Sequence, residues 1–92
     1  MPGNKDISIE PLLNARTPAI AGYVASDQSF DGTSTTYFGF LDREGNWYIQ
    51  QQVVTGNDIA WRYCKGGNGS YAASWIARVG LSYDYYNVVF PL

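Results

Sequence analysis

The clearest pattern in the chain is an alternation of large apolar and polar positions after residue 34. Residues 35–41 are rich in β-branched and aromatic side chains, and residues 47–54 alternate between large apolar residues and glutamines. Between them, residues 43–46 form a turn sequence in which Gly45 can adopt a positive φ. The pattern predicts a β-hairpin.

A third strand and a short helix are predicted after the hairpin. Residues 55–58 turn the chain, and residues 59–64 alternate again, which completes a three-stranded meander. Residues 66–69 interrupt the sheet with glycines. Ser70 can then cap a helix over residues 71–78, because its hydroxyl can accept from the free amides of the first turn. A strand over the same residues is the alternative.

The end of the chain predicts a further strand. Residues 81–90 alternate, with Leu81, Tyr83, Tyr85 and Val89 on one side, and a proline follows where no ladder donor is needed. The predicted fold class is therefore mainly β: a small antiparallel sheet or meander of sandwich-like or barrel-like form. One short helix and an extended N-terminal arm complete it.

Residues 1–34 differ from the rest and are predicted to form an N-terminal arm or loop region. They carry three prolines, and the polar stretch of residues 26–34 is typical of a loop. Residues 35–92 form the compact β-rich domain. We expect the arm to be mobile in the isolated monomer and ordered in an assembly, and we expect removal of residues 1–25 to leave the fold intact.

The composition favours a protein that contacts partners. Only 15% of the residues are charged, against roughly 25% in average soluble domains, whereas 46% are hydrophobic and 16% are aromatic. A chain of 92 residues also buries only about 60 to 65% of the surface that its unfolded form exposes. Some apolar surface is therefore expected to meet another protein, including copies of this chain.

Charge and segment composition argue against several other classes. The net charge of −2 removes the electrostatic attraction behind most nucleic-acid binding. No stretch approaches the ~20 apolar residues of a membrane span, and the N-terminus has no secretory signal, so synthesis in a cytoplasm is expected. Cys64 is the only cysteine and is interpreted as a small residue on a strand.

The sequence predicts no enzyme, cofactor or obligatory metal. It contains no histidine, which excludes Ser-His-Asp and Cys-His sites and leaves zinc too few ligands. Asp27, Ser29 and Asp31 match positions one, three and five of a calcium loop, and a glycine follows at position six. Position twelve is Phe38, which cannot supply the bidentate carboxylate. A solvated turn is therefore favoured over a calcium site.

The aromatic residues allow two interpretations. Tryptophans and tyrosines could stack on sugar rings, but their alternation favours core packing. Interfaces favour tyrosine, so for residues 83–86 both a place in the core and a contact between subunits remain open interpretations. We expect Trp75→Ala to be among the most destabilising changes. The predicted core residues are Tyr37, Trp47, Ile49, Trp61, Trp75, Leu81 and Tyr83. The predicted assembly contacts are Ile7, Ile9, Leu12, Leu13, Tyr23, Tyr85 and Tyr86.

Three short motifs carry a resemblance to a known group of proteins. T-x-Y-x-G starts at Thr35, W-x-I starts at Trp47, and the most distinctive motif, W-x-x-R-x-x-L-x-Y, is formed by Trp75, Arg78, Leu81 and Tyr83. In this order they resemble a group of small, mostly uncharacterised proteins encoded among the structural genes of tailed bacteriophages. The resemblance covers residues 35–83. At residues 64–66 the chain has Cys-Lys-Gly where an Ala-Asp-Gly turn is usual.

The resemblance implies a virion protein made in the host bacterial cytoplasm. Its expected role is that of a structural subunit in head decoration, neck, collar or tail, with other virion proteins and copies of itself as partners. No nucleic acid and no membrane are expected among its partners. The alternative is a carbohydrate-binding module, for example on a phage fibre, where exposed aromatic side chains would bind glycans.

Overall fold

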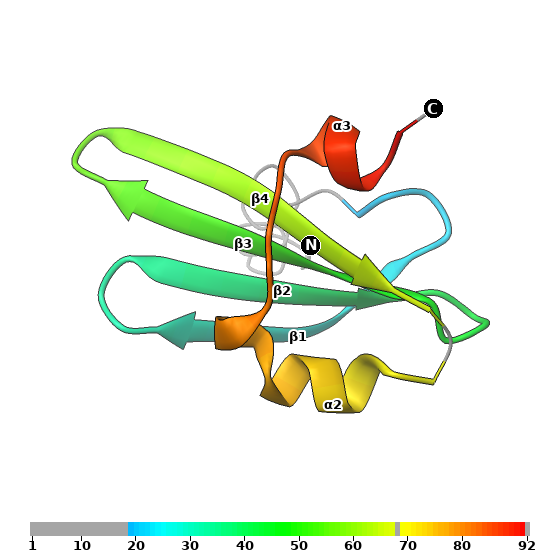
Figure 1. The fold of residues 1–92 in the computed structure, drawn as a ribbon. Helices are drawn as coiled ribbons and strands as arrows, with labels where there is room; N and C mark the ends of the chain where they lie inside the picture. Colours follow the sequence, from blue (N-terminus) through cyan, green and yellow to red (C-terminus); the bar gives the residue numbers. More distant parts are fainter. Residues whose placement is uncertain (1–18, 68, 92) are drawn as a thin grey trace, which may run out of the picture.

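The computed structural model describes residues 19–67 and 69–91. Four strands pair in sequence order as an antiparallel meander: β1 (Val24–Asp31), β2 (Thr35–Leu41), β3 (Trp47–Thr55) and β4 (Asp58–Gly66) (Figure 1). The short helical segments α2 (Tyr71–Ile76), η1 (Arg78–Gly80) and α3 (Tyr86–Val89) follow. The predicted mainly β antiparallel fold is confirmed. The sheet is not closed into a barrel, and two short α-helices are present where one was predicted.

The β2–β3 hairpin forms where the pattern predicted it. Gly45 has a φ of 90°, which a glycine adopts without the steric cost that a Cβ would add. The Asp42 carboxylate holds the turn by accepting from the backbone amides of Glu44 at 2.9 Å and Asn46 at 2.8 Å. In this hairpin Tyr37 pairs with Gln51, and successive large side chains point to alternate faces of the sheet.

The loop predicted for residues 26–34 is wrong, because most of that stretch belongs to β1. β1 pairs with β2 from Val24 to Asp31, with a bulge between Ala25 and Asp27. The polar composition misled the prediction. Alternate residues of an edge strand face solvent or polar partners, so such a strand needs few large apolar side chains. Part of residues 1–34 is thus a strand of the sheet, and residues 1–18 lie outside the described residues.

Helix α2 begins at the predicted position but without the predicted cap. The Ser70 side chain makes no capping hydrogen bond to α2. Its hydroxyl accepts from Trp47 Nε1 at 2.6 Å and donates to the Gly67 carbonyl at 3.0 Å. A helix of six residues is marginal in isolation, so its contacts with the sheet must stabilise it.

The strand predicted over residues 81–90 is also wrong. This segment makes a single β-bridge, in which Asp84 pairs with Tyr63, and then forms α3. Tyr86 and Phe90 stand four positions apart, which places them on one side of a helical turn, and their rings lie 5.3 Å apart. The spacing of Tyr86 and Phe90 indicated a helix, but the alternating tyrosines before them favoured a strand in the sequence analysis.

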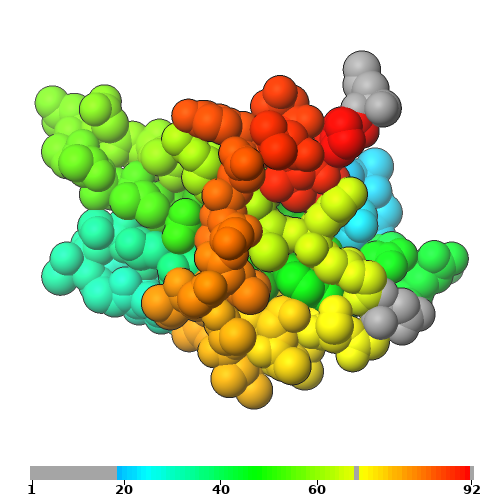
Figure 2. Space-filling model, viewed as in Figure 1, coloured from blue at the N-terminus to red at the C-terminus, as the bar shows by residue number. Residues whose placement is uncertain are grey.

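Both faces of the sheet are covered, which explains why residues on either side of β3 are buried. On the α2 face, Tyr37, Trp47 and Ile49 form a cluster. On the opposite face, here called the α3 face, the cluster consists of Phe38, Phe40, Tyr48 and partly buried residues such as Ile20, Tyr23, Trp61, Tyr63 and Phe90. The chain after η1 crosses the α2 face and passes the edge of β4 before it reaches α3 (Figures 1 and 2).

The described residues contain no helix that is long and apolar enough to cross a membrane.

Candidate functional site

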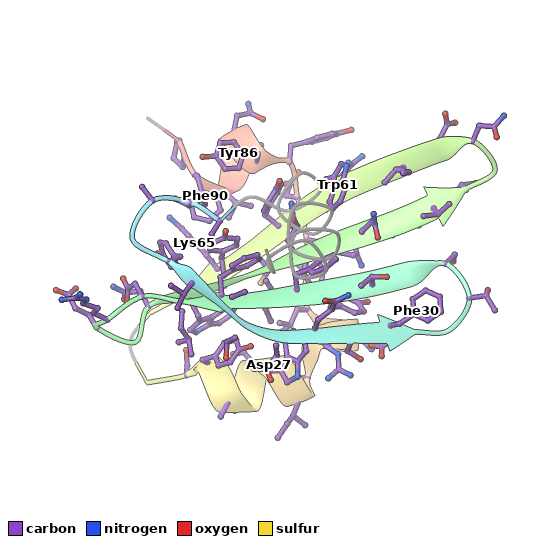
Figure 3. The ribbon with its side chains drawn as sticks, turned by 180° about the vertical axis from the view of Figure 1, so that it is seen from behind. Asp27, Phe30, Trp61, Lys65, Tyr86 and Phe90 are labelled. Carbon is purple, nitrogen blue, oxygen red and sulfur yellow. The ribbon has the colours of Figure 1, made fainter. Side chains whose placement is uncertain are left out.

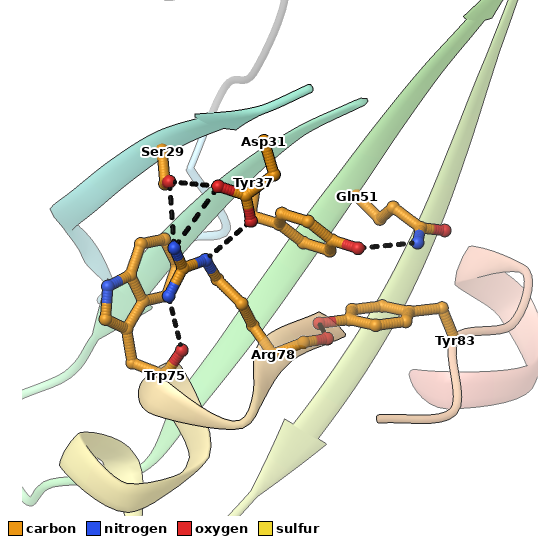
Figure 4. Close-up of polar contacts among 7 residues, drawn as sticks. All are labelled: Ser29, Asp31, Tyr37, Gln51, Trp75, Arg78 and Tyr83. Atoms are coloured by element: carbon orange, nitrogen blue, oxygen red, sulfur yellow. Dashed lines mark hydrogen bonds and ion pairs between the residues drawn. The ribbon is translucent and has the colours of Figure 1, made fainter. Parts of the chain in front are cut away.

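The most distinctive sequence motif is centred on Arg78, which ties the segment after α2 to the edge strand β1. Its guanidinium donates to the Asp31 carboxylate, with 3.1 Å between Nε and Oδ2, and to Ser29 Oγ at 2.9 Å. A third bond runs from Nη1 to the Trp75 carbonyl at 2.9 Å. Figure 4 shows these contacts together. The arginine thus makes bonds to two elements that are far apart in sequence.

The other motif residues surround this arginine. The Arg78 guanidinium lies 4.7 Å from the Trp75 ring centroid, a cation–π distance. Tyr83 donates its hydroxyl to the Arg78 carbonyl at 2.7 Å, and its ring lies 5.7 Å from that of Tyr37. Leu81 packs against the cluster on the α2 face. The whole motif therefore fastens the C-terminal segment onto the sheet.

Tyr71 makes a second connection between α2 and β1. Its hydroxyl donates to Asp27 Oδ2 at 2.6 Å, across 44 positions of sequence. The ring lies over Gly39, where an added Cβ would stand 2.9 Å from Tyr71 Cζ and 3.0 Å from Trp75 Cε3. The glycine of T-x-Y-x-G is therefore needed for the close approach of α2 to β2.

The electrostatics of this region follow from those contacts. The hydrogen bond from Ser29 and then the bond from Arg78 hold the pKa of Asp31 below its usual value. Burial raises the pKa of Tyr71, and its bond to the Asp27 carboxylate raises it further. Burial also raises the pKa of Tyr83. In both residues the protonated hydroxyl donates a hydrogen bond within the subunit.

The residues that were expected to form a solvated turn rather than a calcium loop take part in these contacts instead. Asp27, Ser29 and Asp31 lie on β1, an extended strand, and not in a loop that could wrap an ion. Their alternate spacing places them on one face, where Tyr71 and Arg78 bind them. Among the described residues no group of three or more metal-ligating side chains forms. The same spacing was the signal for a polar strand face, and the sequence interpretation missed it.

The start of the described chain is anchored on the α3 face. The Ile20 amide donates to the Tyr48 hydroxyl at 3.0 Å, and the ring of Tyr23 meets that of Tyr48 edge-on at 5.0 Å. Tyr48 is only 1% exposed, and burial is the main cause that raises its pKa to about 12. Tyr23, predicted as an assembly contact, is therefore partly used inside the subunit.

The other predicted assembly tyrosines lie near α3. Tyr85 is 55% exposed, and the Arg62 guanidinium stacks 4.0 Å from its ring centroid. Tyr86 is half exposed and contacts Tyr63 edge-on at 5.3 Å. Figure 3 shows Tyr86 beside Phe90 on this segment. The remaining predicted contacts, Ile7, Ile9, Leu12 and Leu13, lie outside the described residues.

The three tryptophans are not arranged as one sugar-binding platform. Trp47 is buried on the α2 face, whereas Trp61 packs against the cluster on the α3 face. Trp75 is partly buried between α2 and the sheet. Tyr37 and Ile49 are buried beside Trp47. Among the described residues, the aromatic side chains with the highest exposed fractions are Phe30, Tyr85 and Tyr86.

The two edges of the sheet differ. Beyond β4, the Tyr63 amide donates to the Asp84 carbonyl at 2.8 Å and the Asp84 amide donates back at 2.9 Å, so this edge is partly closed. No segment among residues 19–67 and 69–91 pairs with the outer side of β1. An unpaired strand edge is a site where another chain can add a strand.

Exposed apolar side chains occur on β1 and on the segment that lies beside it. Among the described residues, the four large apolar side chains with the highest exposed fractions are Ile76 (80%), Val79 (69%), Val24 (68%) and Phe30 (64%). Val24 and Phe30 lie on β1, and Figure 3 shows Phe30 near its C-terminal end. Ile76 ends α2 and Val79 lies in η1, the segment that Arg78 fastens to β1.

Comparison with known proteins gives no match. No family model, no curated protein and no solved structure is similar to this chain at a significant level.

Proposed function

We propose that this protein is a structural subunit of a tailed-bacteriophage particle, acting through protein–protein assembly. The observation that carries the assembly role is the open edge of β1 with its surrounding apolar side chains, Val24, Phe30, Ile76 and Val79. Exposed apolar side chains beside an unpaired strand edge favour contact with another protein. The low content of charged residues supports the same conclusion.

The assignment to a phage particle rests on the resemblance of the three motifs. The residues of those motifs make contacts inside the subunit: Gly39 under Tyr71, Arg78 to Asp31, and Tyr83 to the Arg78 carbonyl. Such contacts preserve a shape rather than perform a reaction. A shape-preserving motif suits a building block whose surface varies with its partners.

Cosedimentation tests this role directly. Particles lacking this protein, made by deleting its gene, are mixed with the purified chain and pelleted. We expect the wild type to pellet with the particles, and Phe30→Asp to stay in the supernatant because it places a charge beside the open edge. Ile59→Asp is the matched control, since Ile59 is also half exposed but lies at the β3–β4 hairpin. A wild-type chain that never pellets with such particles contradicts the proposal.

The alternative role, carbohydrate binding, has its own test. Tyr85 and Tyr86 are the exposed tyrosines that could stack on a sugar. Glycan-array binding by the wild type that is lost in Tyr85→Ala would favour this alternative. Equal signals from both proteins, or none, would favour assembly.

A further inference from the structure

Within residues 19–67 and 69–91, the edge of β1 has a bulge and two carboxylates but no other feature that usually protects an edge strand. Native proteins protect such edges with lysines, prolines, inward-pointing charges, bulges or a covering segment. β1 contains no lysine and no proline, and its one irregularity is the bulge between Ala25 and Asp27. Its two carboxylates, Asp27 and Asp31, are held by Tyr71 and Arg78 of the same subunit. As far as the described residues go, the outer side of β1 is unpaired and can accept another strand.

The surroundings of this edge suit an apolar partner. Val24 and Phe30 are exposed on β1 itself, and Ile76 and Val79 are exposed on the segment that lies beside it. A strand added to β1 would gain main-chain hydrogen bonds and could also cover part of this apolar surface. By contrast, Asp84 already pairs with the β4 edge at Tyr63.

We propose that the partner is a second copy of this chain, whose β1 pairs antiparallel with β1 across a two-fold axis at Gln28. A two-fold axis makes two identical strands antiparallel, so the two four-stranded sheets would join into one continuous antiparallel sheet. Each subunit then contributes the exposed Val24 and Phe30 of its β1 to the strand pair.

The charges on β1 select this register. With Gln28 opposite the partner's Gln28, Asp27 lies opposite the partner's Ser29, and the uncharged residues at the partner's bulge, between Ala25 and Asp27, lie near Asp31. Registers centred on the neighbouring residues place Asp27 opposite a carboxylate of the partner, either its Asp27 or its Asp31. Like charges directly opposite one another destabilise a strand pair. The register at Gln28 avoids this repulsion along the whole strand.

This inference deepens the assembly role proposed above and rests on it, because it names one partner for the open edge. It is tested on the purified chain without particles. A failure to pair with itself and a failure to join a particle are therefore separate results.

Disulfide trapping tests the register. Gln28→Cys is made in a Cys64→Ser background, so that the new thiol is the only one. Directly opposite residues in an antiparallel pair have Cα atoms about 4.5 to 5.5 Å apart, within the range that a disulfide spans. We expect mild oxidation to give a covalent dimer that reverts on reduction. Asn57→Cys in the same background is the control. Asn57 lies in the β3–β4 turn, away from β1, so this variant should stay monomeric.

Sedimentation equilibrium tests the association itself. We expect a reversible dimer for the wild type and a dissociation constant at least about tenfold higher for Gln28→Lys, because two cations would face each other on the axis. Gln28 is exposed, so this change should spare the fold, which circular dichroism can check. Asn57→Lys should leave the constant unchanged. A wild type that stays monomeric at about 0.5 mM, or a dimer that Gln28→Lys does not weaken, overturns the inference.

Discussion

Arg78 and Asp31 form an ion pair, 3.1 Å between Nε and Oδ2, that joins the segment after α2 to an edge strand 47 positions earlier. The side chains are only 20% and 26% exposed, so solvent screens the pair less than it screens a fully exposed one. This contact makes β1 part of one unit with α2 and η1.

The first prediction concerns the specificity of that contact for arginine. Arg78→Lys keeps the charge, but one ammonium cannot reproduce the bonds to Asp31, Ser29 and the Trp75 carbonyl. We expect it to lower the urea midpoint of unfolding, and Arg78→Ala to lower it further. Arg43→Ala is the control, because Arg43 is exposed in the β2–β3 turn. Equal midpoints for wild type and Arg78→Ala would show that the contact adds no stability.

The second prediction follows from the lowered pKa of Asp31. A carboxyl group whose pKa is lower in the folded state stabilises the fold above its unfolded pKa, and this contribution is lost as the pH falls through the folded value. We therefore expect the free energy of unfolding to decrease as the pH is lowered from about 5 to 3. Asp31→Asn should make this decrease shallower.

A second carboxyl group contributes to the same pH dependence. The pKa of Asp42 is also lowered, chiefly by its hydrogen bond with the Asn46 side chain. Some acid sensitivity should therefore persist in Asp31→Asn. Urea titrations at several pH values, with Asp58→Asn as a surface control, measure the difference. If Asp31→Asn and Asp58→Asn showed the same slope, the Asp31 carboxylate would not be linked to folding.

The third prediction revises the expectation that Trp75→Ala is among the most destabilising changes. Trp47 is 4% exposed, whereas Trp75 is only partly buried. We expect Trp47→Ala to lower the free energy of unfolding by about 3 to 5 kcal/mol and Trp75→Ala by about 2 to 3 kcal/mol. Chemical denaturation of both variants gives the two values. A larger loss in Trp75→Ala would mean that the contacts of α2 with the sheet dominate stability.

The fourth prediction concerns the close approach of α2 to β2. A Cβ at Gly39 would overlap the ring of Tyr71 and press on Trp75, so Gly39→Ala should destabilise the protein by about 1 to 3 kcal/mol. Gly80→Ala is the matched control, because nothing lies within 4 Å of a Cβ there. Thermal melts of both variants compare them. Similar melting temperatures would contradict the placement of α2 over Gly39.

The fifth prediction concerns deletion at the N-terminus. Removing residues 1–25 takes away Ile20 and Tyr23, which contact Tyr48, and the first residues of β1. We now expect this deletion to lower the melting temperature, in contrast to the expectation from the sequence. Circular dichroism of the truncated chain measures the melting temperature. An unchanged melting temperature would support the original assignment of these residues to the arm.

The sequence was informative where one face of a strand is buried. Alternation located the β2–β3 hairpin and the start of β4, because a period of two in large apolar residues is typical of a strand that packs against a core. It failed at β1, whose side chains meet solvent or the polar groups of Tyr71 and Arg78. Such a strand carries polar residues, which also form loops.

The polar contacts could not be predicted from the sequence for a different reason. Arg78 and Tyr71 were visible as motif or helix residues, but their partners lie 44 to 49 positions away on a strand that was not predicted. Pairing at that distance depends on the placement of α2 and η1 beside β1, at the edge of the sheet opposite β4. The open edge of β1 was hidden for the same reason, since an edge can be recognised only when the strand order is known.

Amide hydrogen exchange is the most direct test of the claim that the protein assembles through its β1 edge. The isolated chain at low concentration is compared with the chain recovered in particles. We expect protection to increase in residues 24–31 and 76–79, with little change at the β3–β4 turn, residues 55–58. Unchanged exchange in β1 together with new protection around Tyr85 and Arg62 would contradict the claim and place the contact at α3.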